Sequence, residues 1–215
     1  MEKSFFDENY DERDERENLN SPKNRRSPRS TFYAIFDFIK TAIIIIFFAL
    51  VIRLFVIQPF IVEGQSMLPT FANNDYLITE KISYLFRSPL RGEVIIFNPP
   101  DNPNVNYIKR VVGLPGDEIE IKDSNIYINS QKISESYLSS DESIDKPTEN
   151  TKINLKNNEY FLLGDNRSHS RDSREIGPVP KTNIVSRIWV RLLPVDNIRA
   201  FAAVEYDNLD KTTTN

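Results

Sequence analysis

One long apolar segment lies near the start of the chain, and only short apolar runs follow it. The segment TAIIIIFFALVIRLFVI contains a single charged residue, Arg53. Residues 34–57 supply the roughly 20 mostly apolar residues that a membrane-spanning helix needs, provided that Lys40 and Arg53 extend toward opposite headgroup layers. The pattern therefore predicts a transmembrane anchor over residues 31–58, with a helix that Pro59 ends.

Two other interpretations of this segment stay open. A buried core helix is one, because only residues 41–52 lie uninterrupted between charges. A cleaved secretory signal is the other, because residues 62–64 loosely fit a small-x-small cleavage rule. The long polar segment before the apolar run argues against cleavage and favours an anchor. Basic residues within 23–40, with few positive charges just beyond the span, predict a cytoplasmic N-terminus and an external C-terminal part.

The remaining pattern predicts one all-β domain between two polar tails. Residues 1–30 offer little to bury and are expected to form a disordered cytoplasmic tail. The domain covers residues 59–205, built of antiparallel sheets, with a polar surface insertion at 130–158 and a frayed tail at 206–215. Residues 122–125 carry a hairpin signal. Short β-like runs separated by turn residues predict strands at 60–63, 76–79, 93–97, 106–112, 117–122, 125–129, 159–163 and 185–191.

The amino-acid composition limits the kinds of catalytic and binding site that the chain can form. The chain has 215 residues, no cysteine, one histidine (His169) and a formal charge of −4. These values exclude a disulfide framework, a thiol nucleophile and a multi-histidine metal site, and they give no electrostatic case for nucleic-acid binding. We expect no cofactor and no metal. The mean hydropathy of −0.43 is typical of a soluble protein, but polar tails dilute one apolar segment in that average.

A serine activated by a neutral lysine is one of the few covalent routes left. Such a lysine needs a pKa well below its usual value of about 10.4, and therefore burial without a carboxylate partner. In NYIKRVVG, strand alternation places Lys109 between Tyr107 and Val111 on one face and turns Arg110 to the other. Taken alone, this segment fits an ordinary edge-strand lysine better.

Ser66 is the candidate nucleophile. It follows a strand-like run and a glycine, at a point where the chain turns and a backbone N–H can be presented, with Pro69 and Thr70 at the exit of the turn. Most serines in such places are only turn residues.

Four motifs that occur in order along the chain favour the catalytic interpretation of Ser66 and Lys109 over the ordinary one. SMLPT at 66–70, RGEVIIF at 91–97, YIKRVVGLPGD at 107–117 and GDNRSHSRDSR at 164–174 follow the predicted anchor. Together they closely resemble the conserved boxes of the bacterial type I signal peptidases. The resemblance implies an all-β, membrane-bound serine endopeptidase that cuts signal peptides from exported preproteins after small-x-small sites, through a Ser–Lys dyad and an acyl-enzyme.

The resemblance also implies roles for single residues. Ser66 matches the nucleophile and Lys109 the general base, while Ser170 matches a serine whose hydroxyl orients the lysine. Asp172 and Arg174 match supporting residues of the last box. Some relatives carry an oxyanion-stabilising serine where this chain has Gly64, so another donor must serve here. We expect an inert His169 and a pairing of Asp165 with Arg110.

An extended signal peptide is expected to add as a strand beside residues 60–65. Its alternate side chains would enter two shallow pockets, while the anchor concentrates the enzyme at the lipid bilayer. The expected substrate-binding residues are Phe60, Val62, Gln65, Met67 and Tyr107.

The expected location is the plasma membrane, single-pass, with the catalytic domain on the outer face; a thylakoid-like membrane also fits. Two competing functions are a membrane-tethered non-catalytic binding module and a self-cleaving Ser–Lys regulator. The intact serine and lysine argue against the first, and the anchor without a DNA-binding domain argues against the second.

Overall fold

The computed structural model describes residues 28–123, 125–138 and 151–206. Most of the predicted N-terminal tail, the centre of the 130–158 insertion and residues 207–215 lie outside these ranges. The chain divides into two units, 1–49 and 50–215, which are taken separately below.

The N-terminal unit contains one long helix, α2 (Pro28–Val51), so residues 28–30 are helical rather than part of a tail. Proline suits this start because its fixed φ favours the first helical turn. Phe32–Leu50 is long and apolar enough to cross a membrane. The large apolar side chains of this span are exposed, unlike those of a core helix.

The helical segment ends before Pro59, which corrects the expected boundary. A π-helical turn, η2 (Ile52–Val56), follows α2, and strand β1 (Ile57–Ile61) begins directly after it. Pro59 lies inside β1. A strand tolerates proline at the edge of a sheet, and β1 pairs only with β2 (Tyr76–Glu80).

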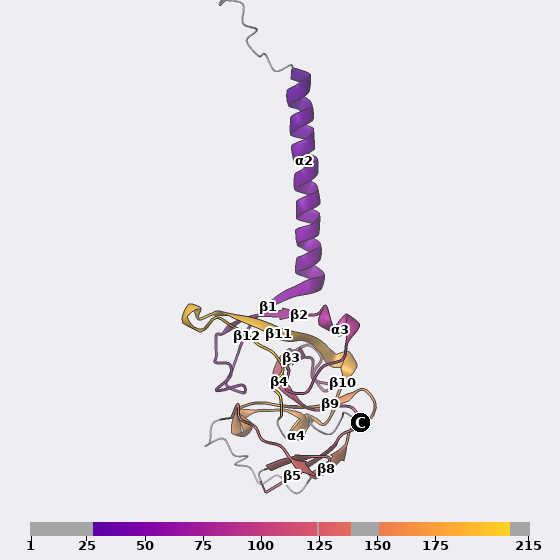
Figure 1. The fold of residues 1–215 in the computed structure, drawn as a ribbon, viewed down its shortest axis with the longest axis vertical. Coiled ribbons are helices and arrows are strands. Elements are labelled where there is room, and N and C mark those ends of the chain that lie inside the picture. Colours follow the sequence, from indigo (N-terminus) through magenta and orange to yellow (C-terminus); the bar gives the residue numbers. More distant parts are fainter. Residues whose placement is uncertain (1–27, 124, 139–150, 207–215) are drawn as a thin grey trace, which may run out of the picture. The chain divides into compact units, whose positions relative to one another are not determined.

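The second unit is built of two antiparallel sheets, which confirms the predicted fold class (Figure 1). The eight-stranded sheet has the order β1-β2-β11-β3-β4-β9-β10, with β12 also paired to β11, and the four-stranded sheet has the order β7-β6-β5-β8. The remaining strands are β3 (Val94–Phe97), β4 (Tyr107–Gly113), β5 (Glu118–Lys122), β6 (Asn125–Ile128), β7 (Gln131–Lys132), β8 (Thr151–Asn154), β9 (Glu159–Leu163), β10 (Val179–Pro180), β11 (Ile184–Leu193) and β12 (Arg199–Ala200). Short helical turns lie between them: α3 (Ser83–Phe86), η3 (Arg167–His169), α4 (Ser173–Ile176), η4 (Lys181–Asn183) and η5 (Val195–Asn197).

The four-stranded sheet corrects the picture of a surface insertion. The predicted 122–125 hairpin joins β5 to β6, with Lys122 opposite Asn125. Strands β7 and β8, however, come from the described parts of 130–158, and Ile133 and Leu155 are buried there. Tyr206, assigned to the frayed tail, is buried in the same hydrophobic cluster. The 130–158 segment and the C-terminal tail have few apolar residues, and these lie among polar ones. Their sequences therefore show no alternation of the kind that predicts a strand.

Strand β4 occupies the centre of the large sheet, between β3 and β9. Its apolar residues join three different hydrophobic clusters: Ile108 packs against one, Val111 belongs to a second and Val112 to a third. A strand anchored this way holds the side chains of Lys109 and Arg110 in fixed directions.

Candidate active site

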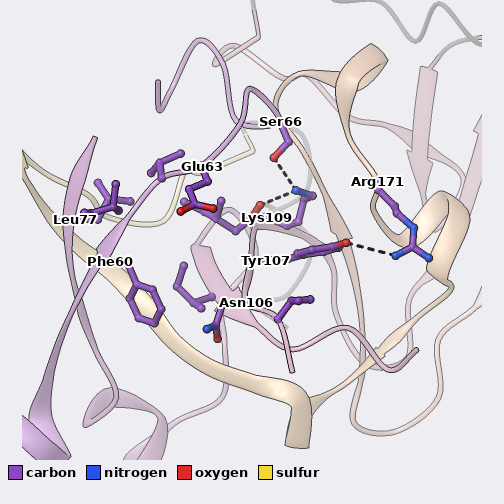
Figure 2. Close-up of a pocket in the computed structure, with 13 residues that line it drawn as sticks. Phe60, Glu63, Ser66, Leu77, Asn106, Tyr107, Lys109 and Arg171 are labelled. Atoms are coloured by element: carbon purple, nitrogen blue, oxygen red, sulfur yellow. Dashed lines mark hydrogen bonds between the residues drawn. The ribbon is translucent and has the colours of Figure 1, made fainter. Parts of the chain in front are cut away.

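Lys109 lies on the buried part of β4, opposite Ile95 of β3. Its side chain is only 3% exposed. The Nζ atom donates a hydrogen bond to Ser66 Oγ at 2.7 Å and another to the Ile108 carbonyl at 2.9 Å. Figure 2 shows the first of these bonds at the wall of a cavity. The two residues singled out in the sequence, 43 positions apart, are therefore in direct contact.

Ser66 is presented by the turn that joins β1 to β2. Asn74 N donates to the Val62 carbonyl at 2.8 Å, which closes the loop around the serine. Gly64 has a φ of +95°, a conformation that favours glycine, and its N–H is held by Asn73 Oδ1 at 2.8 Å. The loop backbone, rather than a side chain at position 64, sets the direction of Ser66.

The last motif is joined to the same turn. Asn166 N donates to the Ser66 carbonyl at 3.0 Å. A Cβ atom on Gly164 would lie 2.2 Å from Ser170 Oγ and 2.6 Å from the Ser66 carbonyl oxygen. Only glycine therefore lets the end of β9 approach the nucleophile this closely.

Burial lowers the pKa of Lys109 to about 8. The negative charges of Asp172 and Asp165 act against this shift, and the positive charge of Arg174 supports it. Among the described residues no carboxylate lies within ion-pair distance of the amine, because each nearby carboxylate has an arginine of its own. A substantial fraction of Lys109 is thus neutral near physiological pH.

Arg110 points to the opposite side of β4, and the predicted pairing with Asp165 is confirmed. Its Nε and Nη2 atoms donate to the Asp165 carboxylate at 2.8 and 2.5 Å. Asp165 also accepts a hydrogen bond from the Thr70 hydroxyl at 2.6 Å. Arg110 also donates to the Gly92 carbonyl of the second motif at 2.9 Å. Since Thr70 belongs to the first motif and Asp165 to the last, this pair connects all four motifs.

A further group of side chains around Arg110 and Arg167 was not predicted from the sequence. The Tyr137 ring lies 4.0 Å from the Arg110 guanidinium carbon, and its hydroxyl is 2.9 Å from that of Tyr206. Glu135 forms an ion pair with Arg167. The only local signal was a tyrosine and a glutamate in the polar 130–158 segment, and nothing in that segment identifies Arg110 or Arg167 as their partners.

The three supporting residues of the last motif differ in their contacts. Asp172 accepts hydrogen bonds from Gly164 N at 3.0 Å and from Arg174 Nε at 2.8 Å, and Arg174 also donates to the Arg167 carbonyl at 2.6 Å. Ser170 Oγ is buried and has no hydrogen-bond partner among the described residues. The expected contact of Ser170 with Lys109 is therefore not formed in this structure, in which the amine instead donates to Ser66 and Ile108.

A cavity of about 500 Å³ lies beside the Ser66–Lys109 pair. Phe60, Val62 and Tyr107, three of the five predicted substrate-binding residues, line it. Gln65 is exposed outside it, and Met67 is almost fully buried in the core. The turn reverses the chain between Val62 and Phe71, and so directs Met67 into the core with Leu77. Among described residues the cavity is lined by Phe60, Ile61, Val62, Glu63, Ser66, Leu77, Ile96, Val105, Asn106, Tyr107, Ile108, Lys109 and Arg171.

His169 lies apart from this cavity. Its Nδ1 atom is 2.8 Å from Ser168 Oγ, and the residue is not among those lining the cavity. That His169 is an inert loop residue stays a prediction.

Residues 35–193 match the family described as signal peptidase, peptidase S26. The chain belongs to the signal peptidase family. A probable signal peptidase I-2 of Synechocystis is 37% identical over 83% of this chain and 81% of its own length. A signal peptidase I of Leptolyngbya laminosa is 40% identical over 74% and 80%, respectively. The crystal structure of a signal peptidase I from Enterococcus faecalis is 31% identical and covers 47% of this chain and 97% of its own, with a TM-score of 0.40.

Membership makes this protein a serine-type endopeptidase, and the apolar helix α2 is consistent with the membrane association of such enzymes. The family match extends from the apolar helix through the last motif. It therefore includes both Ser66 and Lys109.

Proposed function

We propose that this signal peptidase removes N-terminal signal peptides from preproteins with Ser66 as nucleophile and Lys109 as general base. The observation that carries the proposal is the 2.7 Å contact between a hydroxyl and an amine whose pKa burial lowers to about 8. Lysine serves as a base only when it is deprotonated, so the lowered pKa and the contact are both needed.

In the first step the Ser66 oxygen attacks the scissile carbonyl carbon while its proton passes to Lys109 Nζ. The tetrahedral intermediate then collapses, the C–N bond breaks, and the ammonium of Lys109 returns that proton to the leaving amine. This leaves an acyl ester on Ser66 and the mature protein as the first product. In the second half a water molecule gives a proton to Lys109 and attacks the ester carbon. The C–O bond to Ser66 then breaks, the Lys109 ammonium returns that proton to the Ser66 oxygen, and the signal peptide leaves with a new carboxyl group.

The developing oxyanion needs hydrogen-bond donors, and loss of one donor typically lowers the rate 10²- to 10³-fold. Gly64 supplies no hydroxyl, and its N–H is already bonded to Asn73. We assign one donor to the Ser66 backbone N–H, as for other nucleophiles presented in a tight turn.

The cavity favours small side chains at two substrate positions. Its wall is formed by the apolar side chains of Phe60, Val62, Leu77, Ile96 and Ile108, several of which belong to the core cluster. Because a packed core does not yield to bulky groups, alanine-sized residues fit against this wall and larger ones clash. An extended substrate with the pattern Ala-x-Ala presents two such residues on one side.

The bilayer is the second part of the proposal. Helix α2 has the length and composition of an anchor, and basic residues before it favour a cytoplasmic N-terminus, with the catalytic unit on the outer face of the plasma membrane or of a thylakoid-like membrane. Membrane attachment raises the effective concentration of a substrate held in the same bilayer.

The test uses the full chain in non-ionic detergent and a preprotein with an Ala-x-Ala site. We expect cleavage by wild type and by the matched controls Ser134→Ala and Lys122→Ala, and none by Ser66→Ala or Lys109→Ala. Equal cleavage by wild type and Lys109→Ala would overturn the dyad. A wild type that binds the preprotein without cutting it, or that cuts only itself, would support one of the two competing functions instead.

A further inference from the structure

One charged side chain on the wall of the cavity has no partner. Glu63 lines the cavity three residues before Ser66, is exposed, and forms no hydrogen bond or ion pair with any residue that the structure describes. A free carboxylate in a cleft attracts a cationic ligand group, because the low-dielectric walls weaken screening.

The opposing positive charge in this cavity is already shared. Arg171 donates to Asp101 at 2.5 Å, lies 3.8 Å from Glu175, and donates to the Tyr107 hydroxyl at 3.4 Å. In Figure 2, Arg171 and Glu63 lie on opposite sides of the space beside Ser66, with Tyr107 between them. Lys109, the other cation on the wall, is buried and bonded to Ser66 and the Ile108 carbonyl. The exposed charge without a partner on this wall is therefore the negative charge of Glu63.

The alternation of burial along residues 60–63, which continues past the end of β1 at Ile61, indicates which substrate position Glu63 meets. Phe60 and Val62 pack toward the core, whereas Ile61 and Glu63 are exposed. In a peptide lying alongside residues 60–65, the residues that face the same side of the pair are neighbours. The two small residues of a small-x-small site face the wall with Phe60 and Val62, and the middle residue x faces the side of Glu63.

We propose that Glu63 is a specificity-determining residue that favours a lysine or arginine at the middle position of the small-x-small site and disfavours an acidic residue there. This inference rests on the proposed function, because it assumes that the substrate strand lies beside residues 60–65. Exposed ion pairs are weak, so we expect a two- to fivefold higher kcat/KM for the basic substrate than for the neutral one.

The test uses three peptides of otherwise equal sequence, with Ala-Lys-Ala, Ala-Gln-Ala and Ala-Glu-Ala before the scissile bond, and the full chain in non-ionic detergent. Wild type should cleave them in the order Lys, Gln, Glu. Glu63→Gln should cleave the three at similar rates, and Glu63→Lys should reverse the order. Asp123→Asn removes an equal charge from an exposed turn of the four-stranded sheet and should keep the wild-type order.

Salt provides a second readout. At 1 M salt the screening length falls to about 3 Å, so the preference of wild type should shrink toward that of Glu63→Gln. An unchanged preference in Glu63→Gln, or loss of cleavage of all three peptides by that variant, would overturn the assignment while leaving the dyad intact. Absence of cleavage by wild type would overturn the proposed function itself, and this inference with it.

Discussion

Strand β4 carries two neighbouring cationic residues, Lys109 and Arg110, on its two faces. Their surroundings shift the two pKa values in opposite directions. Lys109 and Arg110 are equally buried, each about 3% exposed. Arg110 faces Asp165 through two hydrogen bonds and lies against the Tyr137 ring, whereas Lys109 faces a serine hydroxyl and a backbone carbonyl. The pKa of Arg110 is raised by its hydrogen bonds and charge interaction with Asp165, which outweigh burial, and that of Lys109 falls to about 8.

The difference teaches that burial alone does not decide the state of a cation. Burial penalises both charges to a similar degree, but only Arg110 has a carboxylate to offset the penalty. Asp165 and Asp172 lie close enough to affect Lys109, yet both are bonded to arginines. Because Arg110 and Arg174 bind these two carboxylates, neither of them forms an ion pair that would keep Lys109 protonated.

Replacing Lys109 with methionine should break the comparison most completely. We expect kcat/KM to fall about 10⁴-fold, the upper range for loss of a general base. At pH 7 the variant should be more stable than wild type by up to about 3 kcal/mol, because the folded protein no longer holds an amine whose pKa is lowered from 10.5 to about 8.

The pH dependence of the free energy of unfolding tests whether folding lowers the pKa of Lys109. Between pH 8 and 10.5 the unfolded lysine binds a proton that the folded one does not, so the free energy of unfolding of wild type should rise with pH across this window. The Lys109→Met variant should lack this rise. Urea titrations followed by the fluorescence of Trp189, the single tryptophan, measure both. A variant less stable than wild type at pH 7 would mean that the amine is solvated.

Breaking the Arg110–Asp165 pair should have the next largest effect. Arg110→Met leaves the buried Asp165 carboxylate without its cation, which typically costs 3–5 kcal/mol of unfolding free energy. Uncompensated, Asp165 should also raise the pKa of Lys109, and so shift the pH–activity curve to higher pH.

The double variant Arg110→Met/Asp165→Leu provides the control. Removing both charges should recover most of the lost stability, because apolar replacements often stabilise as well as a buried pair. It should also return the pH–activity curve to lower pH. If Arg110→Met and the double variant were equally unstable, the loss would come from packing rather than from the unpaired buried charge of Asp165.

Much of this comparison was predictable from sequence, because it depends on a period of two. The alternation of NYIKRVVG separates the two cations, and the absence of cysteine, with a single histidine, makes a lysine one of the few candidate bases for a serine. The Arg110–Asp165 pair, 55 residues apart, was also anticipated, since both belong to recognised motifs.

The rest depends on contacts that no local pattern encodes. From the polar segment, Glu135 pairs with Arg167 and the Tyr137 ring lies against Arg110, while Tyr206 contacts Tyr137. The sequence around these residues shows neither a strand period nor a motif. Met67 follows the nucleophile directly, but a turn reverses its direction and buries it.

The pH–activity profile should report the pKa of Lys109, the lysine of this pair of cations. Only the neutral amine accepts the Ser66 proton, so kcat/KM should fall tenfold for each pH unit below an apparent pKa of about 8. Asp172→Asn should lower that apparent pKa, because the Asp172 charge raises the pKa of the lysine. A midpoint near pH 10 in wild type would show that Lys109 is not desolvated.

The smallest effect on stability is expected at Ser170, whose hydroxyl is buried without a partner among the described residues. The nearby Ser173 provides a comparison, because its hydroxyl accepts a hydrogen bond from Leu162 N at 2.9 Å. Ser173→Ala breaks a made hydrogen bond and should cost about 1–2 kcal/mol of unfolding free energy, whereas Ser170→Ala removes an unsatisfied group and should cost nothing or add up to about 1 kcal/mol. If the Ser170 hydroxyl bonds the ammonium of Lys109 once the amine has taken the Ser66 proton, Ser170→Ala should lower kcat with little change in KM. A Ser170→Ala variant with unchanged kcat would limit its role to filling space beside Gly164, and the lysine face of β4 would then act through Ser66 and the Ile108 carbonyl alone.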